Sequence, residues 1–331
     1  MATISHRGER QWQAKIRRKG VTTANTFETK VRAEAWARQI EADIDAGRFH
    51  PGRIEAERTT LKEALERYLS EKVPLKKGIK QSTGILRYWL GTDLAARSLA
   101  SIRASEIAAW RDQFLKQRSP QTVVHYLNLL SNVFTVASSE WSMESLVNPV
   151  GKVKKPTLPR GRDRRLAPDE ESILLAACDA SKSKWLGTMV RLALETAMRQ
   201  GEFVGLAWDD VNLDRRTIFL RETKNGSSRT VPLSSRAIEV LRAWQAMTGG
   251  KGKLFDIEVG RAVSHAFLSV CRKAKLDDLH FHDLRHEATS RFFEKTSLRD
   301  MQIAMITGHR SMEMLKRYAH IRAEELAKEL G

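Results

Sequence analysis

A basic stretch rich in proline and glycine, residues 149–166, separates two parts of the chain that have different sequence patterns. It holds three prolines and two glycines, and its seven lysines and arginines accompany a single acidic residue, Asp163. Proline lacks a backbone donor and glycine is conformationally free, so neither residue favours a regular helix or strand here. We therefore expect a linker whose positive charges follow a phosphate backbone. Two domains joined in this way could close around a polyanion as a clamp.

The charge of the whole chain supports a polyanionic partner. The 331 residues, enough for two or three domains, carry a formal net charge of +17, and the sequence pI is near 10.1. Lysine and arginine bind phosphates and release condensed counterions, so double-stranded DNA is the expected partner. A ribosomal or other architectural protein, or merely a basic surface, remains open on composition alone.

Other bulk features place the chain in the cytoplasm. No apolar run approaches the length of a membrane span, and the first residues lack the apolar core of a signal peptide. No membrane partner is therefore expected. Cys178 and Cys271 have no metal-site spacing and lie in apolar helical patterns. Buried free thiols in a reducing compartment are the expected state.

Residues 1–52 have the pattern of a small sheet with one helix. Strand-like runs lie at 11–17 and 22–29, on either side of a turn at Lys19-Gly20. A helix is expected over 31–46, and its apolar face would comprise Val31, Ala35, Trp36, Ile40 and Ile44. Basic strands of this kind could enter a DNA groove, or the unit could merely pack against a neighbour.

Residues 57–150 are helical throughout in their pattern. Thr60 and Glu63 form a capping box, and Ser119-Pro120 supplies an N-cap and a first-turn proline. Several lysines lie between the apolar positions and face either DNA or solvent. Together with the linker they make up the expected DNA-binding residues: Lys76, Lys77, Lys80, Lys152, Lys154, Lys155, Arg160, Arg162, Arg164 and Arg165.

Residues 166–331, beyond the linker at 151–165, combine helices with one β-hairpin. Two short strands at 217–220 and 230–233 enclose Asn225-Gly226, a pair typical of a two-stranded turn. Polar residues fall at the element boundaries of this part, although each of them alone is weak evidence of a site. They are Arg199, Lys224, His282, Arg285, His309 and Tyr318.

The order and spacing of these six residues resemble those of the tyrosine recombinases, also called the phage integrase family. The shared pattern is Arg-x-Gly-Glu, a hairpin lysine, His-x-x-Arg, Gly-His, and a tyrosine nine residues after that histidine. The segments 194–202 and 280–287 are similar to those of shufflon-type DNA invertases. The resemblance implies a mainly α fold with small β elements: an arm-type N-terminal domain, a helical core-binding domain and an α+β catalytic domain.

The resemblance also implies a mechanism that uses neither a metal nor ATP nor another cofactor. Arg199 and Arg285 would hold the nonbridging phosphate oxygens, because a guanidinium group presents paired and permanently charged donors. His309 would donate a hydrogen bond to the phosphate. The phenol of Tyr318 has an ordinary pKa near 10, so it needs a base, for which His282 is the candidate. Lys224 would protonate the departing 5′ oxygen.

Some positions depart from the family pattern or need a choice. Phe203 follows the Gly-Glu where the family often has leucine or isoleucine, and Lys224 is preferred over Arg221 and Arg229 because the family lysine lies at the turn. Glu202 is expected to support the site rather than take part in chemistry. The histidines at 280, 282 and 286 could suggest a metal, but the stretch lacks the glutamate of a zinc protease.

Three functions remain compatible with the fold. A site-specific recombinase for integration, excision or inversion is the first, and it would act as a homotetramer on synapsed DNA and be a monomer or weak dimer when free. The second is a catalytically silent DNA-binding regulator, and the third is a relaxing enzyme with type IB topoisomerase chemistry. The helix-forming tail at 321–330 could dock on a neighbouring protomer or pack on its own domain.

Overall fold

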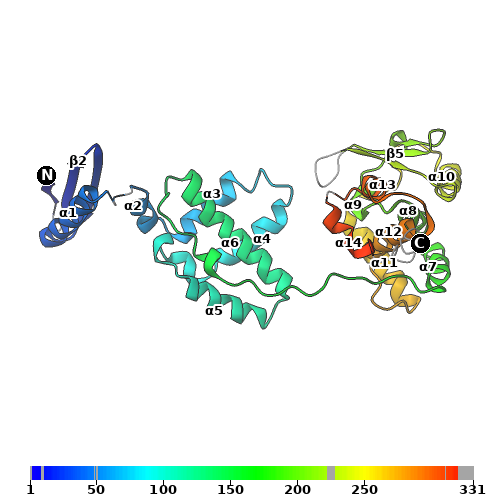
Figure 1. The fold of residues 1–331 in the computed structure, drawn as a ribbon, viewed down its shortest axis with the longest axis horizontal. Helices are drawn as coiled ribbons and strands as arrows, with labels where there is room; N and C mark the ends of the chain where they lie inside the picture. The colour runs from blue at the N-terminus through cyan, green and yellow to red at the C-terminus, as the bar shows by residue number, and fades with distance from the viewer. Residues whose placement is uncertain are drawn as a thin grey trace, which may run out of the picture. The chain divides into compact units, whose positions relative to one another are not determined.

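The computed structural model describes residues 2–8, 11–47, 49, 51–221, 228–309 and 311–319 of the chain. Contacts divide the chain into two compact units, Met1–Arg160 and Gly161–Gly331. Lys224 and the tail at 321–330 lie outside the described residues. Within the described part of the chain, no helix is long and apolar enough to cross a membrane. The predicted fold class, mainly α with small β elements, is confirmed (Figure 1).

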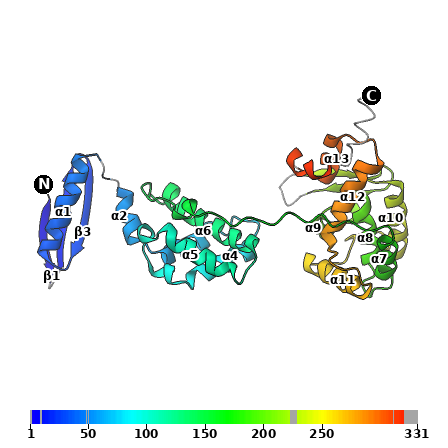
Figure 2. The same cartoon turned by 60° about the horizontal axis from the view of Figure 1, so that its bottom comes forward.

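The first unit begins with an antiparallel sheet covered by one helix (Figure 2). The strands pair in chain order, and Lys19 and Gly20 both have positive φ, which suits the two-residue turn between the second and third strands. The expected helix forms, but its predicted apolar face is partly wrong: Val31 is 71% exposed, and Ala33 and Ala37 are buried instead. The elements are β1 (Thr3–Gly8), β2 (Gln11–Arg18), β3 (Val21–Phe27) and α1 (Lys30–Asp45).

The rest of this unit is helical, as expected. Thr60 caps its helix through the predicted capping box with Glu63, and the hydroxyl of Ser119 accepts a hydrogen bond from the backbone N–H of Thr122. Buried aromatic and aliphatic side chains such as Trp89 form the core. The elements are α2 (Pro51–Arg58), α3 (Leu61–Glu71), α4 (Ile79–Leu90), η1 (Asp93–Ala96), η2 (Leu99–Ser101), α5 (Ala104–Leu115), α6 (Pro120–Glu140) and η3 (Pro149–Lys152).

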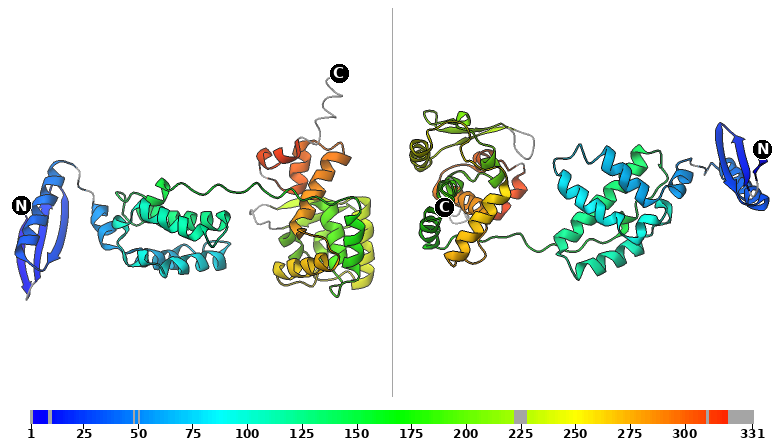
Figure 3. Two further views of the ribbon diagram at one scale, coloured as in Figure 1. Left: turned by 90° about the horizontal axis from the view of Figure 1, so that it is seen from below. Right: turned by 180° about the vertical axis from the view of Figure 1, so that it is seen from behind.

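The second unit combines helices with a small antiparallel sheet. Helix α8 contacts α7, α10 and α12, and the C-terminal helices α13 and α14 pack on α12 (Figure 3, orange to red). The sheet adds a strand that the sequence did not predict, β4, beside the expected hairpin. The elements are α7 (Glu170–Asp179), α8 (Leu186–Thr196), α9 (Gln200–Val204), η4 (Trp208–Asp210), β4 (Val211–Asn212), β5 (Thr217–Leu220), β6 (Arg229–Pro232), α10 (Ser235–Thr248), α11 (Gly260–Lys273), α12 (Phe281–Lys295), α13 (Asp300–Thr307), η5 (Met312–Met314) and α14 (Lys316–Ala319).

Two features of this unit position polar residues. Ala197 ends α8 in the left-handed conformation, with φ of 52°, and this turn places Arg199 at the start of α9. Helix α12 is central and carries buried polar side chains, among them Asp283, Arg285 and Glu287. Cys178 and Cys271 are buried free thiols, as predicted, and burial raises the pKa of each to about 12.

Candidate active site

Arg199 is held by groups from two separate elements. Its Nη1 lies 3.0 Å from Oε1 of Glu202, and its Nη2 donates to the carbonyl oxygen of Gly308 at 2.8 Å. The Glu202 carboxylate also accepts from both Nη atoms of Arg229, at 2.7 and 2.8 Å. Burial raises the pKa of Glu202, but these two arginines more than offset it and leave the pKa below its ordinary value. Glu202 therefore supports Arg199, as predicted.

Gly308 brings the end of α13 against this cluster. It has φ of +71°, and a Cβ at this position would lie 2.8 Å from the guanidinium of Arg229. Arg229 also donates from Nε to the carbonyl oxygen of Ile306 at 3.2 Å. Glycine therefore suits the left-handed turn, and its lack of a Cβ leaves room for the guanidinium of Arg229. The turn leads directly into His309.

Arg285 is almost completely buried, at 4% exposure. It donates to the carbonyl oxygen of Ala197 at 2.5 Å and to Nε2 of His309 at 3.1 Å, and both of these acceptors are uncharged. Burial, followed by the positive charge of Arg199, lowers the pKa of Arg285 to about 9. A guanidinium in these surroundings remains charged at neutral pH, and an anion close by would stabilise it.

His309 has one defined tautomer in this arrangement. Arginine can only donate, so Nε2 of His309 accepts from Arg285, and the ring proton therefore lies on Nδ1. Nδ1 then donates to the hydroxyl of Thr307 at 2.7 Å, and that hydroxyl donates to the carbonyl oxygen of Ile303 at 2.7 Å. Burial, with the nearby Arg285 and Arg199, lowers the pKa of His309 to about 3. The imidazole is thus neutral.

Tyr318 lies in an apolar cluster with its hydroxyl directed at α12. The side chain is 5% exposed, and its ring stacks on Phe293 with 5.7 Å between centroids and 13° between planes. The hydroxyl oxygen lies 2.6 Å from Nδ1 of His286, the residue that follows Arg285. His282 is exposed one turn earlier, and its ring centroid is 5.0 Å from that of His286. His286 therefore bonds to the phenol, and His282, the predicted base, is its neighbour on the helix.

The predicted general acid, Lys224, lies outside the described residues. The two arginines of the same hairpin that were alternative candidates for this role both form ion pairs. Arg221 contacts Asp210 at 2.6 Å, and Arg229 contacts Glu202. Phe203, the departure from the family pattern, is fully buried in the core of the unit. It fills space as leucine would.

Three of the arginines assigned to the linker bind carboxylates of the second unit. Arg162 contacts Asp278 and Asp283 at 2.9 Å. Arg165 lies 3.0 Å from Glu287 and also pairs with Glu294, and Arg164 pairs with Glu170. Although burial raises it, hydrogen bonds from Arg165 and Arg291 hold the pKa of Glu287 below its ordinary value. Arg162 and Arg165 thus fasten the linker to α12, and Arg164 fastens it to α7. Their contact with DNA remains a prediction.

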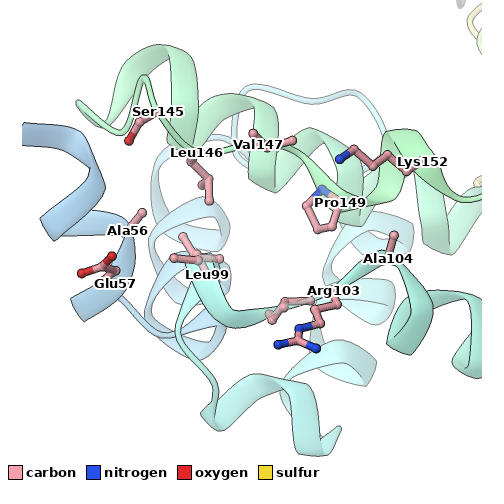
Figure 4. A pocket seen from close by; sticks show the side chains of 12 residues that line it. Ala56, Glu57, Leu99, Arg103, Ala104, Ser145, Leu146, Val147, Pro149 and Lys152 are labelled. Atoms are coloured by element: carbon pink, nitrogen blue, oxygen red, sulfur yellow. The ribbon is translucent and has the colours of Figure 1, made fainter. Parts of the chain in front are cut away.

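The remaining predicted DNA-binding residues lie in the first unit. The ammonium of Lys76 lies 4.9 Å from the ring centroid of Tyr68, while Lys80 is exposed and lines a pocket beside α6. Lys152 lines a cavity of about 620 Å³ together with Arg103 (Figure 4). The others are exposed: Lys77, Lys154, Lys155 and Arg160.

Two residues of this site were not assigned to it from the sequence. His286 was considered only as a metal ligand, although its spacing of four from His282 puts both on one helix face. Arg229 was considered only as an alternative to Lys224. Its role as a partner of Glu202 depends on the approach of two segments 27 residues apart in sequence. No local pattern reveals such a contact.

Comparison of sequences identifies relatives of the chain. A model of the phage integrase family matches residues 164–325. The chain is 42% identical to the shufflon-specific DNA recombinase of Escherichia coli, over 82% of this chain and 71% of that protein. It is 35% identical to a putative integrase/recombinase of Haemophilus influenzae, over 96% of this chain and 86% of the relative.

Comparison of structures gives the same fold. A lambda integrase dimer bound to a COC′ core site matches with a TM-score of 0.65 and 22% identity, covering 97% of this chain and 95% of that one. A lambda integrase tetramer bound to a Holliday junction matches with a TM-score of 0.65 and the same identity, covering 93% and 95%. The Tn1549 transposon integrase in complex with transposon right end DNA has a TM-score of 0.67 and 16% identity, covering 82% and 100%.

Proposed function

This chain belongs to the phage integrase family and is a site-specific tyrosine recombinase, and we propose that Tyr318 is the nucleophile with which it cleaves DNA. One observation carries the assignment. Buried Arg285, on α12, donates to the carbonyl oxygen of Ala197, two residues before Arg199, and to the imidazole of His309. The next residue of the helix, His286, bonds to the hydroxyl of Tyr318. The proposed anion-binding arginine and the partner of the proposed nucleophile are thus adjacent on one helix.

The proposed reaction transfers a phosphodiester to Tyr318 and back. Arg199 and Arg285 bind the nonbridging oxygens, whose negative charge grows in the transition state. His309 contributes a further hydrogen bond to the phosphate. His282, the base predicted from the sequence, lies one turn before His286, which meets the hydroxyl of Tyr318. Lys224 gives a proton to the departing 5′ oxygen. The 3′-phosphotyrosine link conserves the energy of the broken bond, so rejoining requires no ATP, and the roles assigned here need no metal.

The proposed substrate is double-stranded DNA, with the basic linker against its phosphate backbone. The lambda integrase relatives occur as a dimer on a core site and as a tetramer on a Holliday junction. We expect the same assembly here: four copies on synapsed DNA, from a free monomer or weak dimer. The two buried free thiols support action in the cytoplasm.

The biological outcome is integration, excision or inversion. The likeness to the shufflon-specific recombinase supports inversion, while the sheet and helix at the N-terminus support an integrase with a second DNA site. Sequencing the junctions that the purified protein forms between candidate DNA ends will identify the crossover site. Junctions that reverse the segment between two sites support inversion, and junctions that unite two molecules support integration.

The nucleophile is tested by trapping the protein on a nicked duplex that carries the recovered crossover site. The wild-type protein should form an adduct that survives denaturation, and Tyr318→Phe should form none. Tyr126→Phe, in the helical part of the first unit, is the matched control and should form the adduct normally. An adduct with Tyr318→Phe would refute the assignment.

A further inference from the structure

The hydroxyl of Tyr318 has a defined hydrogen-bond partner on α12. Nδ1 of His286 lies 2.6 Å from the hydroxyl oxygen, a short distance for a hydrogen bond between oxygen and nitrogen. The ring of Tyr318 also stacks on Phe293. The imidazole therefore meets the reacting atom of the proposed nucleophile.

The surroundings of His286 contain polar and charged groups from three elements. His282 is one turn away on the same helix, with its ring perpendicular to that of His286. His309, from the segment after α13, is close enough for the two imidazoles to interact electrostatically. Arg285 precedes it in the chain and interacts with Tyr318 through its charge. His286 thus contacts the nucleophile and directly follows Arg285, a proposed phosphate-binding residue.

We propose that His286 is a catalytic residue, the immediate acceptor of the proton that Tyr318 loses when it attacks DNA. The proposal rests on the proposed function, because it concerns the same nucleophile. It moves the base role assigned to His282 by four residues along α12. The reason is contact: a base has to be within hydrogen-bond reach of the proton it removes, and His286 meets that condition.

The step balances without any further reactant. The O–H bond of Tyr318 breaks, and its proton passes to Nδ1 of His286 as the phenolic oxygen forms a bond to phosphorus. The bond from phosphorus to the 5′ oxygen then breaks, and that oxygen keeps the electron pair and takes a proton from the general acid. On rejoining, the 5′ hydroxyl returns its proton to the general acid and its oxygen attacks phosphorus. The bond from phosphorus to the phenolic oxygen breaks, and His286 returns the proton to Tyr318.

The first test measures the contact in the free, full-length protein. The chain has four tyrosines, so labelling each at the ring carbon that bears the hydroxyl gives four NMR signals, and Tyr318→Phe identifies one of them. His286→Ala should shift the Tyr318 signal. His286→Asn should shift it less, because an asparagine amide reaches about the same position as Nδ1. His265→Asn, at an exposed position on α11, should leave it unchanged.

The second test measures cleavage of the nicked duplex. Both His286→Ala and His286→Asn should cleave roughly 100-fold or more slowly than wild type, since general bases contribute at least that factor. A 5′-bridging sulfur in the substrate makes a leaving group that needs no proton. It should restore the rate of Lys224→Ala and leave both His286 variants slow. His265→Asn should cleave normally on both substrates.

The outcomes separate this proposal from the assignment of the nucleophile. Wild-type cleavage by His286→Asn would mean that the histidine only positions the phenol, and the proposal would be wrong. Rescue of the His286 variants by the sulfur substrate, or an unmoved Tyr318 signal in His286→Ala, would overturn it as well. An adduct formed by Tyr318→Phe would instead overturn the proposed function, whatever the His286 variants do.

Discussion

Arg285 donates a hydrogen bond to His309, with Nη2 of the arginine 3.1 Å from Nε2 of the imidazole. The direction of this bond requires a neutral histidine, and the lowered pKa of His309, about 3, agrees with it. A bound phosphate competes for the donors of Arg285. In order to donate to that phosphate as predicted, His309 has to release Arg285 and present a protonated nitrogen.

The pKa of His309 predicts how stability depends on pH. The folded value of about 3 lies below the ordinary 6.5, so the unfolded chain binds the proton more readily. The free energy of unfolding should therefore fall as the pH drops from about 6.5 toward 3, by up to about 1.4 kcal/mol per pH unit. Urea unfolding at a series of pH values measures this change.

His309→Gln is the matched variant, because an amide oxygen can accept from Arg285 but does not titrate in this range. The difference in unfolding free energy between wild type and variant should shrink or reverse toward acid pH. Parallel curves for the two proteins over pH 6.5 to 4 would show that His309 does not carry this dependence.

The elements with strong local signals could be predicted from the sequence. The capping box at Thr60 and the first-turn proline after Ser119 act within a single turn, so their neighbours in the sequence determine them. The register of α1 could not be read in this way. Hydropathy favours Val31, but Ala33 and Ala37 face the sheet, where small side chains let helix and strands pack closely.

The sequence predicted several of the residues that the structure brings together, but not the contacts between them. Spacing identified Arg199, Arg285 and Tyr318 because the family pattern is local around each of them. Two of the linker arginines have partners far away in sequence: Arg165, for example, pairs with Glu287, 122 residues later. Composition indicates a positive linker, but it cannot distinguish a phosphate partner from a carboxylate of the same chain.

Anions should stabilise the second unit through Arg285. The guanidinium is 4% exposed and Arg199 lies near it, so an oxyanion between the two offsets a buried charge. At ten times its dissociation constant, such an anion adds about 1.4 kcal/mol to the free energy of unfolding. Thermal unfolding in sodium sulfate and in sodium chloride of equal ionic strength measures the gain.

Arg285→Met tests the origin of that gain. Methionine fills a similar volume without charge, so the variant should unfold at a higher temperature than wild type in chloride and should gain less from sulfate. Arg261→Gln, an exposed site on α11, should respond to sulfate as wild type does. Equal sulfate responses in all three proteins would assign the effect to the salt in general.

Glu202 should be important for stability as well as for activity. Its carboxylate is 5% exposed and binds Arg199 and Arg229, so Glu202→Gln leaves two guanidinium groups without their counterion. Loss of one partner of a buried pair costs about 3 kcal/mol. Because the two cysteines of the chain, Cys178 and Cys271, are buried in the second unit, their reaction with a thiol reagent reports its unfolding.

The control for this variant is Glu239→Gln, at an exposed position on α10, which should change the free energy of unfolding by less than about 0.5 kcal/mol. Glu202→Gln should also reduce adduct formation, since Arg199 is no longer held toward Gly308. If thiol reactivity were the same in both variants, the carboxylate would have no structural role.

The linker arginines should separate into two classes when they are replaced singly. Arg160 is exposed, whereas Arg165 binds a Glu287 side chain that is only 5% exposed. Arg165→Gln should therefore lower the free energy of unfolding by about 1–2 kcal/mol. Arg160→Gln should leave the free energy of unfolding unchanged. If the guanidinium of Arg160 meets a phosphate, this variant should also reduce the slope of log affinity against log salt concentration by about 0.9.

Binding of the recovered DNA site at several salt concentrations, together with urea unfolding, tests both expectations. A reduced slope without a loss of stability in Arg165→Gln would mean that this arginine leaves Glu287 to bind DNA.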